Sequence, residues 1–140
     1  MALLMDKTAL AEFMAREFEQ VADDFTIEEV REMGILIRLN VDDRHLRPGG
    51  TISGPSMFAL ADVSVYLAVL AMIGPKALAV TTNISMDFMR KPAAATDLLC
   101  DCRLLKLGRS LAVGECLIRS DGQEAPVARA SMTYAIPPDR

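Results

Sequence analysis

Apolar and polar side chains follow two different periods along the first part of the chain. Residues 7–24 place apolar side chains at helical spacing, which predicts an amphipathic helix on Leu10, Phe13, Met14, Phe18 and Val21. From residue 34 the period becomes two, which is typical of a half-buried strand. We expect this strand over residues 34–42, with a buried face made by Ile35, Ile37, Leu39 and Val41.

A long apolar helix is predicted next, over the stretch "GPSMFALADVSVYLAVLAMI". It begins at Gly54-Pro55, because proline suits the first helical turn, and it ends before Gly74-Pro75. The stretch approaches the length of a membrane span, but Asp62 near its middle would cost roughly 2.5–3.5 kcal/mol in a bilayer. Since nearly every face is apolar, we expect a buried core helix in a cytoplasmic protein that makes no membrane contact.

Four antiparallel strands are predicted after this helix, over residues 78–88, 97–107, 110–120 and 125–136, with a hairpin signal at Asp121-Gly122. Strict alternation in the first of them predicts two faces. One face carries Leu78, Val80, Thr82, Ile84, Met86 and Phe88, and the other carries Thr81, Asn83, Ser85 and Asp87. The simplest way to cover the apolar helix is one curled antiparallel sheet around it, which is an α+β fold.

Composition excludes several classes of protein. A chain of 140 residues with a net charge of -4 fits one domain and argues against a nucleic-acid binder. Cys100, Cys102 and Cys116 have no zinc-type spacing and read as core residues, while one histidine, His45, excludes a His-rich metal site. We therefore expect no metal and no cofactor. The start "MALLMDKTALAEF" meets charge too early for a signal peptide.

Three stretches together resemble a known family: "HLRPGGTISGPSMFALAD", "NISMDFMRKPA" and "LLKLGRSLAVGE". They are similar to the hotdog-fold acyl-CoA thioesterases of the phenylacetate-pathway (PaaI-like) type. The resemblance covers about residues 34–136 and implies a curled antiparallel sheet around one long buried helix, with an additional N-terminal helix. We accordingly expect an N-terminal helical extension over residues 1–33 and a hotdog thioesterase domain over residues 34–140.

The resemblance also implies functional residues. Gly54 matches the glycine whose backbone N–H polarises the thioester carbonyl, and Asp62 matches the acid that serves as general base or nucleophile. Ser53 stands where the family has histidine, Arg47 where it has asparagine and Pro55 where it has a second glycine. The catalytic candidates are Asp62, Gly54, Ser53 and Thr81. The candidates for binding acyl-CoA are Arg47, Met57, Asn83, Arg90, Lys91, Lys106 and Arg109.

The spacing of Gly54 and Asp62 has a consequence of its own. Eight helical residues separate them, which is roughly 12 Å along the axis at ~1.5 Å per residue. Asp62 therefore cannot reach a carbonyl bound at Gly54 of its own chain. A helix start favours developing negative charge, so the two groups fit one site if a second subunit brings its Asp62 to Gly54. If the protein is a catalyst, this spacing predicts a homodimer with its sites at the interface. The resemblance implies thioester hydrolysis and allows a dimer of dimers (a homotetramer).

The same residues also allow other interpretations. Asp62 could have a purely structural role, paired with Ser64, Thr81 or Arg47. The hydroxyl of Ser53 could simply bond the helix start, and the basic residues could be solvated surface charges. A non-catalytic acyl-CoA-binding hotdog protein, or a thioesterase that acts on acyl groups held by a carrier protein, would fit the same pattern. A dehydratase is disfavoured, because His45 lies in the loop ahead of the helix.

Overall fold

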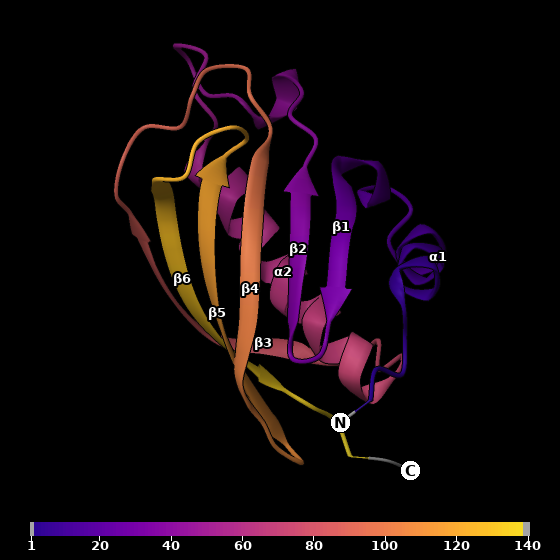
Figure 1. Ribbon diagram of the computed structural model, residues 1–140. Coiled ribbons are helices and arrows are strands. Elements are labelled where there is room, and N and C mark those ends of the chain that lie inside the picture. Colours follow the sequence, from indigo (N-terminus) through magenta and orange to yellow (C-terminus); the bar gives the residue numbers. More distant parts are fainter. Residues whose placement is uncertain (1, 139–140) are drawn as a thin grey trace.

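A six-stranded antiparallel sheet curls around one long helix in the computed structural model, which describes residues 2–138 (Figure 1). The strand order is β1-β2-β4-β5-β6-β3, which leaves β1 and β3 at the two edges. The helices are α1 (Lys7–Glu17) and α2 (Gly54–Ile73), with short 3-10 turns η1 (Ala22–Asp24) and η2 (Asp43–His45). The strands are β1 (Phe25–Arg31), β2 (Gly34–Leu39), β3 (Val80–Phe88), β4 (Leu98–Leu107), β5 (Leu111–Ser120) and β6 (Pro126–Ala135). This arrangement confirms the predicted α+β fold.

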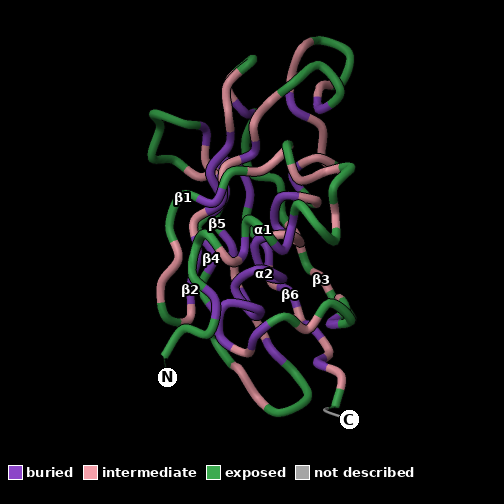
Figure 2. Tube along the Cα trace, turned by 90° about the vertical axis from the view of Figure 1, so that its right-hand side faces the viewer, coloured by how far each residue is buried: buried purple, intermediate pink, exposed green. Residues whose placement is uncertain are grey.

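Helix α2 forms the centre of the core, as its apolar sequence predicts. Leu60, Leu67 and Leu70 are fully buried, and Figure 2 shows α2 as a buried segment enclosed by more exposed strands and loops. By length and composition α2 could cross a membrane, but 67% of its most apolar window is buried inside the protein. The helix ends at Gly74, whose φ of 93° lies in a region that glycine adopts readily.

The N-terminal region differs from the expectation of a helical segment over residues 1–33. Helix α1 ends at Glu17 rather than at residue 24, and Phe25–Arg31 is an edge strand paired with β2. A boundary at residue 33 would therefore separate two paired strands of one sheet. The strand escapes sequence reasoning because a bulge between Ile27 and Glu29 interrupts its alternation of apolar and polar residues.

A second bulge corrects the predicted faces of β3. The register shifts between Thr81 and Asn83, so Thr81 pairs with the buried Tyr134 while Asn83 pairs with Thr133. Cross-strand partners share a face, hence Thr81 lies on the inner face of the sheet, the same face as Ile84. Strict alternation places Thr81 and Ile84 on opposite faces, and that prediction is wrong because of the extra residue in the bulge.

The three cysteines belong to the core, as expected. Cys100, Cys102 and Cys116 are buried and unbridged on the neighbouring strands β4 and β5. Burial is the main cause that raises the pKa of the Cys100 thiol, which keeps it protonated and unreactive.

Candidate active site

The carboxylate of Asp62 is held by two hydroxyl groups from the sheet. Thr81 Oγ1 on β3 donates to Asp62 Oδ1 at 2.5 Å, and the Tyr134 hydroxyl on β6 donates to the same oxygen at 2.6 Å. The Tyr134 hydroxyl also lies 3.0 Å from the carbonyl oxygen of Asp62. Asp62 is half-buried, so these bonds offset part of the cost of placing a charge beside the core. Both hydroxyl groups bond to Oδ1, and among the described residues no group donates a hydrogen bond to the second oxygen, Oδ2.

The partners of Asp62 settle which of the anticipated pairings forms. Thr81 is a partner, whereas Ser64 donates to the carbonyl of Leu60 at 2.7 Å and Arg47 lines a different cavity. The sequence analysis does not single out Tyr134. A buried tyrosine nevertheless needs a hydrogen-bond partner for its hydroxyl. Burial and the bond to Asp62 raise the pKa of Tyr134, so this side chain remains a neutral donor.

A cavity of about 350 Å³ opens beside Asp62. Its apolar walls come from α1 and the segment after it, from α2, and from the start of β3 and the segment before it: Met14, Phe18, Val21, Val63, Tyr66, Ala77, Ala79 and Val80. Phe18 packs edge-on against Tyr66 with ring centroids 5.6 Å apart, and Tyr66 lies 6.0 Å from Tyr134. The N-terminal residues thus wall this cavity, a role that sequence reasoning did not assign to them.

Gly54 begins helix α2 at the other end of the candidate site. Ser53 is the N-cap, and its hydroxyl accepts a bond from Ser56 N at 3.2 Å. This is the structural role that the sequence offered for Ser53. The N–H of Gly54 belongs to the first helical turn, where backbone donors have no partner within the helix. A methyl group at Gly54 would lie 3.4 Å from Cζ of Phe88, so the absent side chain keeps this approach open.

A second cavity, of about 430 Å³, adjoins Gly54. It gathers most of the residues predicted to bind substrate: Arg47, Met57, Arg90 and Lys91 line it together with Phe88. Arg109 lines another cavity, of about 610 Å³, beside the β4–β5 turn, and Lys106 precedes that turn. Asn83 is exposed on the outer face of the sheet and lines none of these three cavities.

Within one chain the two halves of the candidate site are therefore apart. Asp62 and Gly54 lie on the same helix, roughly 12 Å apart at ~1.5 Å per residue, and they line separate cavities. Over residues 2–138 no group of three or more His, Cys, Asp or Glu side chains is arranged to hold a metal ion. The chemistry to be explained is that of a carboxylate, two hydroxyl groups and a helix start.

Comparison with known proteins identifies the family to which this curled sheet around one buried helix belongs. The sequence profile of the thioesterase superfamily matches residues 49–127. The chain belongs to this superfamily and has the hotdog fold. Membership supports a hydrolase that acts on thioesters.

Three solved structures illustrate the likeness. A candidate thioesterase from Silicibacter sp. TM1040 is 60% identical, with a TM-score of 0.93 over 99% of this chain and 96% of that chain. A mutant of the phenylacetic acid degradation protein PaaI from Thermus thermophilus is 23% identical, with a TM-score of 0.73 over 85% of this chain and 99% of its own. A hypothetical thioesterase from Streptococcus pneumoniae, solved with coenzyme A, is 20% identical, with a TM-score of 0.76 over 94% of this chain and 99% of its own. The last two show the fold.

Proposed function

We propose that this protein hydrolyses an acyl-CoA thioester to the free acid and CoA, at a site that two subunits share. The observation that carries the proposal is the carboxylate of Asp62, which two hydroxyl groups hold at the edge of an apolar cavity in a thioesterase fold. Two bonds occupy Oδ1, so Oδ2 is the oxygen available for chemistry. An isolated, oriented carboxylate of this kind suits a general base or a nucleophile.

The proposed reaction needs no metal and no cofactor. Asp62 takes a proton from a water molecule, the water oxygen attacks the thioester carbon, and the carbonyl oxygen becomes an oxyanion. The N–H of Gly54 donates to this oxyanion at the start of α2. When the tetrahedral intermediate collapses, the carbon–sulfur bond breaks and CoA leaves as a thiolate, a good leaving group. In the covalent variant Asp62 itself attacks the carbon, the carbon–sulfur bond breaks and CoA leaves as a thiolate, and water then hydrolyses the anhydride to the free acid and the Asp62 carboxylate.

The edge strand β3 supports a shared site. Its start, at Thr81, touches Asp62, and its end, at Phe88, lies beside Gly54. A two-fold axis that pairs β3 antiparallel with β3 of a second copy brings the start of one strand to the end of the other. Asp62 of one subunit then approaches Gly54 of its partner. An edge strand with unpaired backbone groups and exposed apolar side chains, such as Val80 (55% exposed) and Phe88 (54%), suits such pairing.

The same two-fold axis would bring the basic residues of the two subunits close together. The strand register places the β4–β5 turn at the Thr81 end of β3 and the 90–91 segment at its other end. In the proposed dimer, Lys106 and Arg109 of one subunit therefore approach Arg90 and Lys91 of the other. Such a cluster fits the phosphate groups of CoA. Arg47 beside Gly54 adds to it, and Met57 offers an adaptable apolar contact.

The apolar cavity beside Asp62 is the proposed place for the acyl group. Its volume of about 350 Å³ and its walls of Phe18, Tyr66 and Val63 suit a ligand of modest size without charge. We expect the protein to work in the cytoplasm, where acyl-CoA is made and consumed, as a dimer or a dimer of dimers.

The test is release of CoA from a panel of aryl-CoA and fatty-acyl-CoA esters by the wild type and by Asp62→Asn. Asparagine keeps the shape and accepts the bonds from Thr81 and Tyr134, but it is neither a base nor a nucleophile. We expect turnover to fall by about 100-fold or more in Asp62→Asn, as for loss of a general base. Binding of acyl-CoA with no turnover would favour a non-catalytic protein. Turnover of acyl-carrier-protein esters alone would show that the substrate is an acyl group held by a carrier protein and not acyl-CoA.

A further inference from the structure

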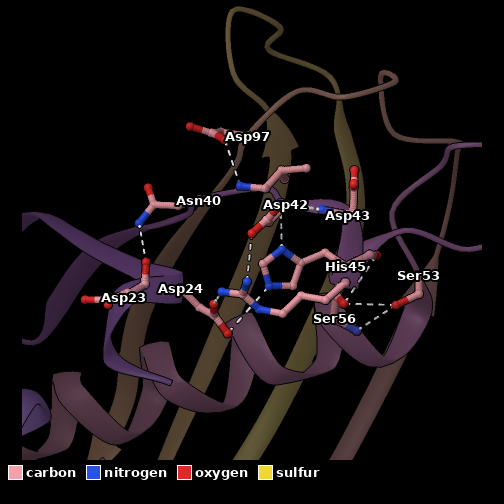
Figure 3. Close-up of polar contacts among 11 residues, drawn as sticks. Asp23, Asp24, Asn40, Asp42, Asp43, His45, Ser53, Ser56 and Asp97 are labelled. Carbon is pink, nitrogen blue, oxygen red and sulfur yellow. Dashed lines mark hydrogen bonds and ion pairs between the residues drawn. The ribbon is translucent and has the colours of Figure 1, made fainter. Parts of the chain in front are cut away.

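The loop that leads to Gly54 is built around His45, the one histidine of the chain. The His45 side chain is only 8% exposed, and its Nδ1 accepts a hydrogen bond from Asp42 N at 2.9 Å (Figure 3). In return, the Asp42 carboxylate accepts from Asp43 N at 2.8 Å and from the Arg44 guanidinium at 2.8 Å. These hydrogen bonds all lie within residues 42–45 and fix the conformation of the short turn η2. The position of the His45 backbone therefore depends on the state of its own side chain.

The His45 backbone in turn holds the start of α2. Its carbonyl oxygen accepts from Ser53 N at 2.8 Å and lies 3.4 Å from the Ser56 hydroxyl. The Ser53 hydroxyl caps α2 through Ser56, and the backbone bridge between Leu46 and Ile52 closes the loop between the two points. Gly54 follows Ser53 directly, so the direction of the Gly54 N–H is set by a residue bonded to His45.

The bond to Nδ1 shows that the imidazole is neutral. Because Nδ1 accepts a backbone N–H, it carries no proton, and the single ring proton lies on Nε2. Nε2 is buried without a hydrogen-bond partner and lies 3.5 Å from Oδ2 of Asp24, in the turn η1 ahead of β1. Asp24 also contacts the Arg44 guanidinium. His45 thus joins the N-terminal segment, the turn η2 and the start of α2.

We infer that His45 is a positioning residue for the Gly54 N–H: its neutral imidazole fixes η2, and its carbonyl fixes the N-cap of α2. The inference rests on the proposed function, in which that N–H donates to the oxyanion. His45 touches neither substrate nor the reacting atoms, so its effect passes through Ser53 and Gly54. A small displacement of an oxyanion donor is costly, because catalysis requires it in place before charge develops.

Protonation of His45 would break this arrangement. A charged imidazole carries protons on both nitrogens, so Nδ1 would face the N–H of Asp42 as a second donor and the bond would be lost. The charged groups around the ring are Asp24 from η1, Asp42 at the N-cap of η2 and Arg44 from η2. The start of α2 contributes the uncharged Ser56 and its N-cap, Ser53. Burial, followed by the charge of Arg44, lowers the pKa of His45 from its usual 6.5. The neutral form therefore predominates at pH 6.5 and above, and it is lost as the pH falls through the lowered pKa.

Two substitutions at the same position separate positioning from simple support. His45→Asn keeps an acceptor for Asp42 N and cannot be protonated in this range, whereas His45→Phe fills the space without an acceptor. We expect His45→Phe to lower kcat by about 10- to 100-fold at neutral pH with little change in KM, as for a misplaced donor. We expect His45→Asn to restore most of that loss. It should also remove the part of the acid fall in kcat that follows the imidazole titration.

Nitrogen-15 NMR of the wild type provides a readout that does not depend on turnover. With one histidine in the chain, the ring signals are unambiguous, and we expect the Nε2–H tautomer at neutral pH. The amide signal of Gly54 should shift, and its exchange with solvent should quicken, along the same titration curve as the ring. The inference would be overturned if His45→Phe had the kcat of the wild type. It would also be overturned if the Gly54 amide signal did not change as the His45 ring titrates. A wild type that turns over no ester would instead refute the proposed function, and the Gly54 amide would still decide whether His45 positions it.

Discussion

Two points on helix α2, Asp62 near its middle and Gly54 at its start, are held in opposite ways. Around Asp62, the carboxylate is fixed by hydroxyl groups 19 and 72 positions away along the chain, on β3 and β6. Around Gly54, the contacts join residues of one continuous loop, with separations of 3 and 11 positions. The arrangement around Asp62 therefore exists only when the whole sheet is formed, whereas the arrangement around Gly54 depends on local loop geometry.

In the proposed mechanism the residues around Asp62 and around Gly54 perform different work. A base must keep one oxygen free and the other fixed, which the sheet and the aromatic side chains around Tyr134 provide. An oxyanion donor must point in the right direction, and a loop with its own hydrogen bonds can be adjusted without disturbing the core. Changes around Asp62 should thus alter both stability and turnover, and changes around Gly54 chiefly turnover.

Among changes that leave Asp62, Gly54 and His45 in place, the largest effect is expected for Tyr134→Phe. Removal of one hydroxyl leaves Oδ1 with a single donor, so the carboxylate is less well oriented and less well solvated. We expect the free energy of unfolding to fall by about 1–2 kcal/mol and kcat to fall by about tenfold. Chemical denaturation and steady-state kinetics measure the two effects.

Tyr66→Phe is the matched control for Tyr134→Phe. Tyr66 lines the same cavity, but its hydroxyl donates to the carbonyl of Ala77 at 3.1 Å and does not touch Asp62. We expect its kcat to stay within about twofold of the wild type. An equal loss of kcat in both variants would mean that Tyr134 supports the cavity rather than the carboxylate.

A smaller effect is expected at the charged positions. Replacement of Arg90 and Lys91 by glutamine should raise KM for acyl-CoA about fivefold, lessen its dependence on salt and leave kcat unchanged, because the contact with phosphate is the same in the ground and transition states. Replacement of Lys106 and Arg109 should act in the same way if two subunits share the site. Arg103→Gln is the control, since Arg103 pairs with Glu115 on the exposed sheet surface.

The comparison also explains what the sequence could and could not predict. The start of α2 at Gly54, its cap at Ser53 and the apolar core helix follow from local signals, and the isolated acid at Asp62 stands out in its apolar run. Thr81 was proposed through a family resemblance, while simple alternation placed it on the wrong face. The bulges in β1 and β3 and the bond from Tyr134 depend on strand register, which no short stretch of sequence encodes.

The central claim, that one site takes Asp62 from one subunit and Gly54 from the other, is tested most directly by mixing two inactive variants. Asp62→Asn lacks the base, and Gly54→Leu places a side chain toward Phe88 in the space proposed for the carbonyl. Subunit exchange between equal amounts should form mixed dimers in half of the population, each with one intact site. We predict recovery of about one quarter of wild-type turnover. If exchange is verified by mass and the mixture stays as inactive as its parents, the site is not shared between subunits.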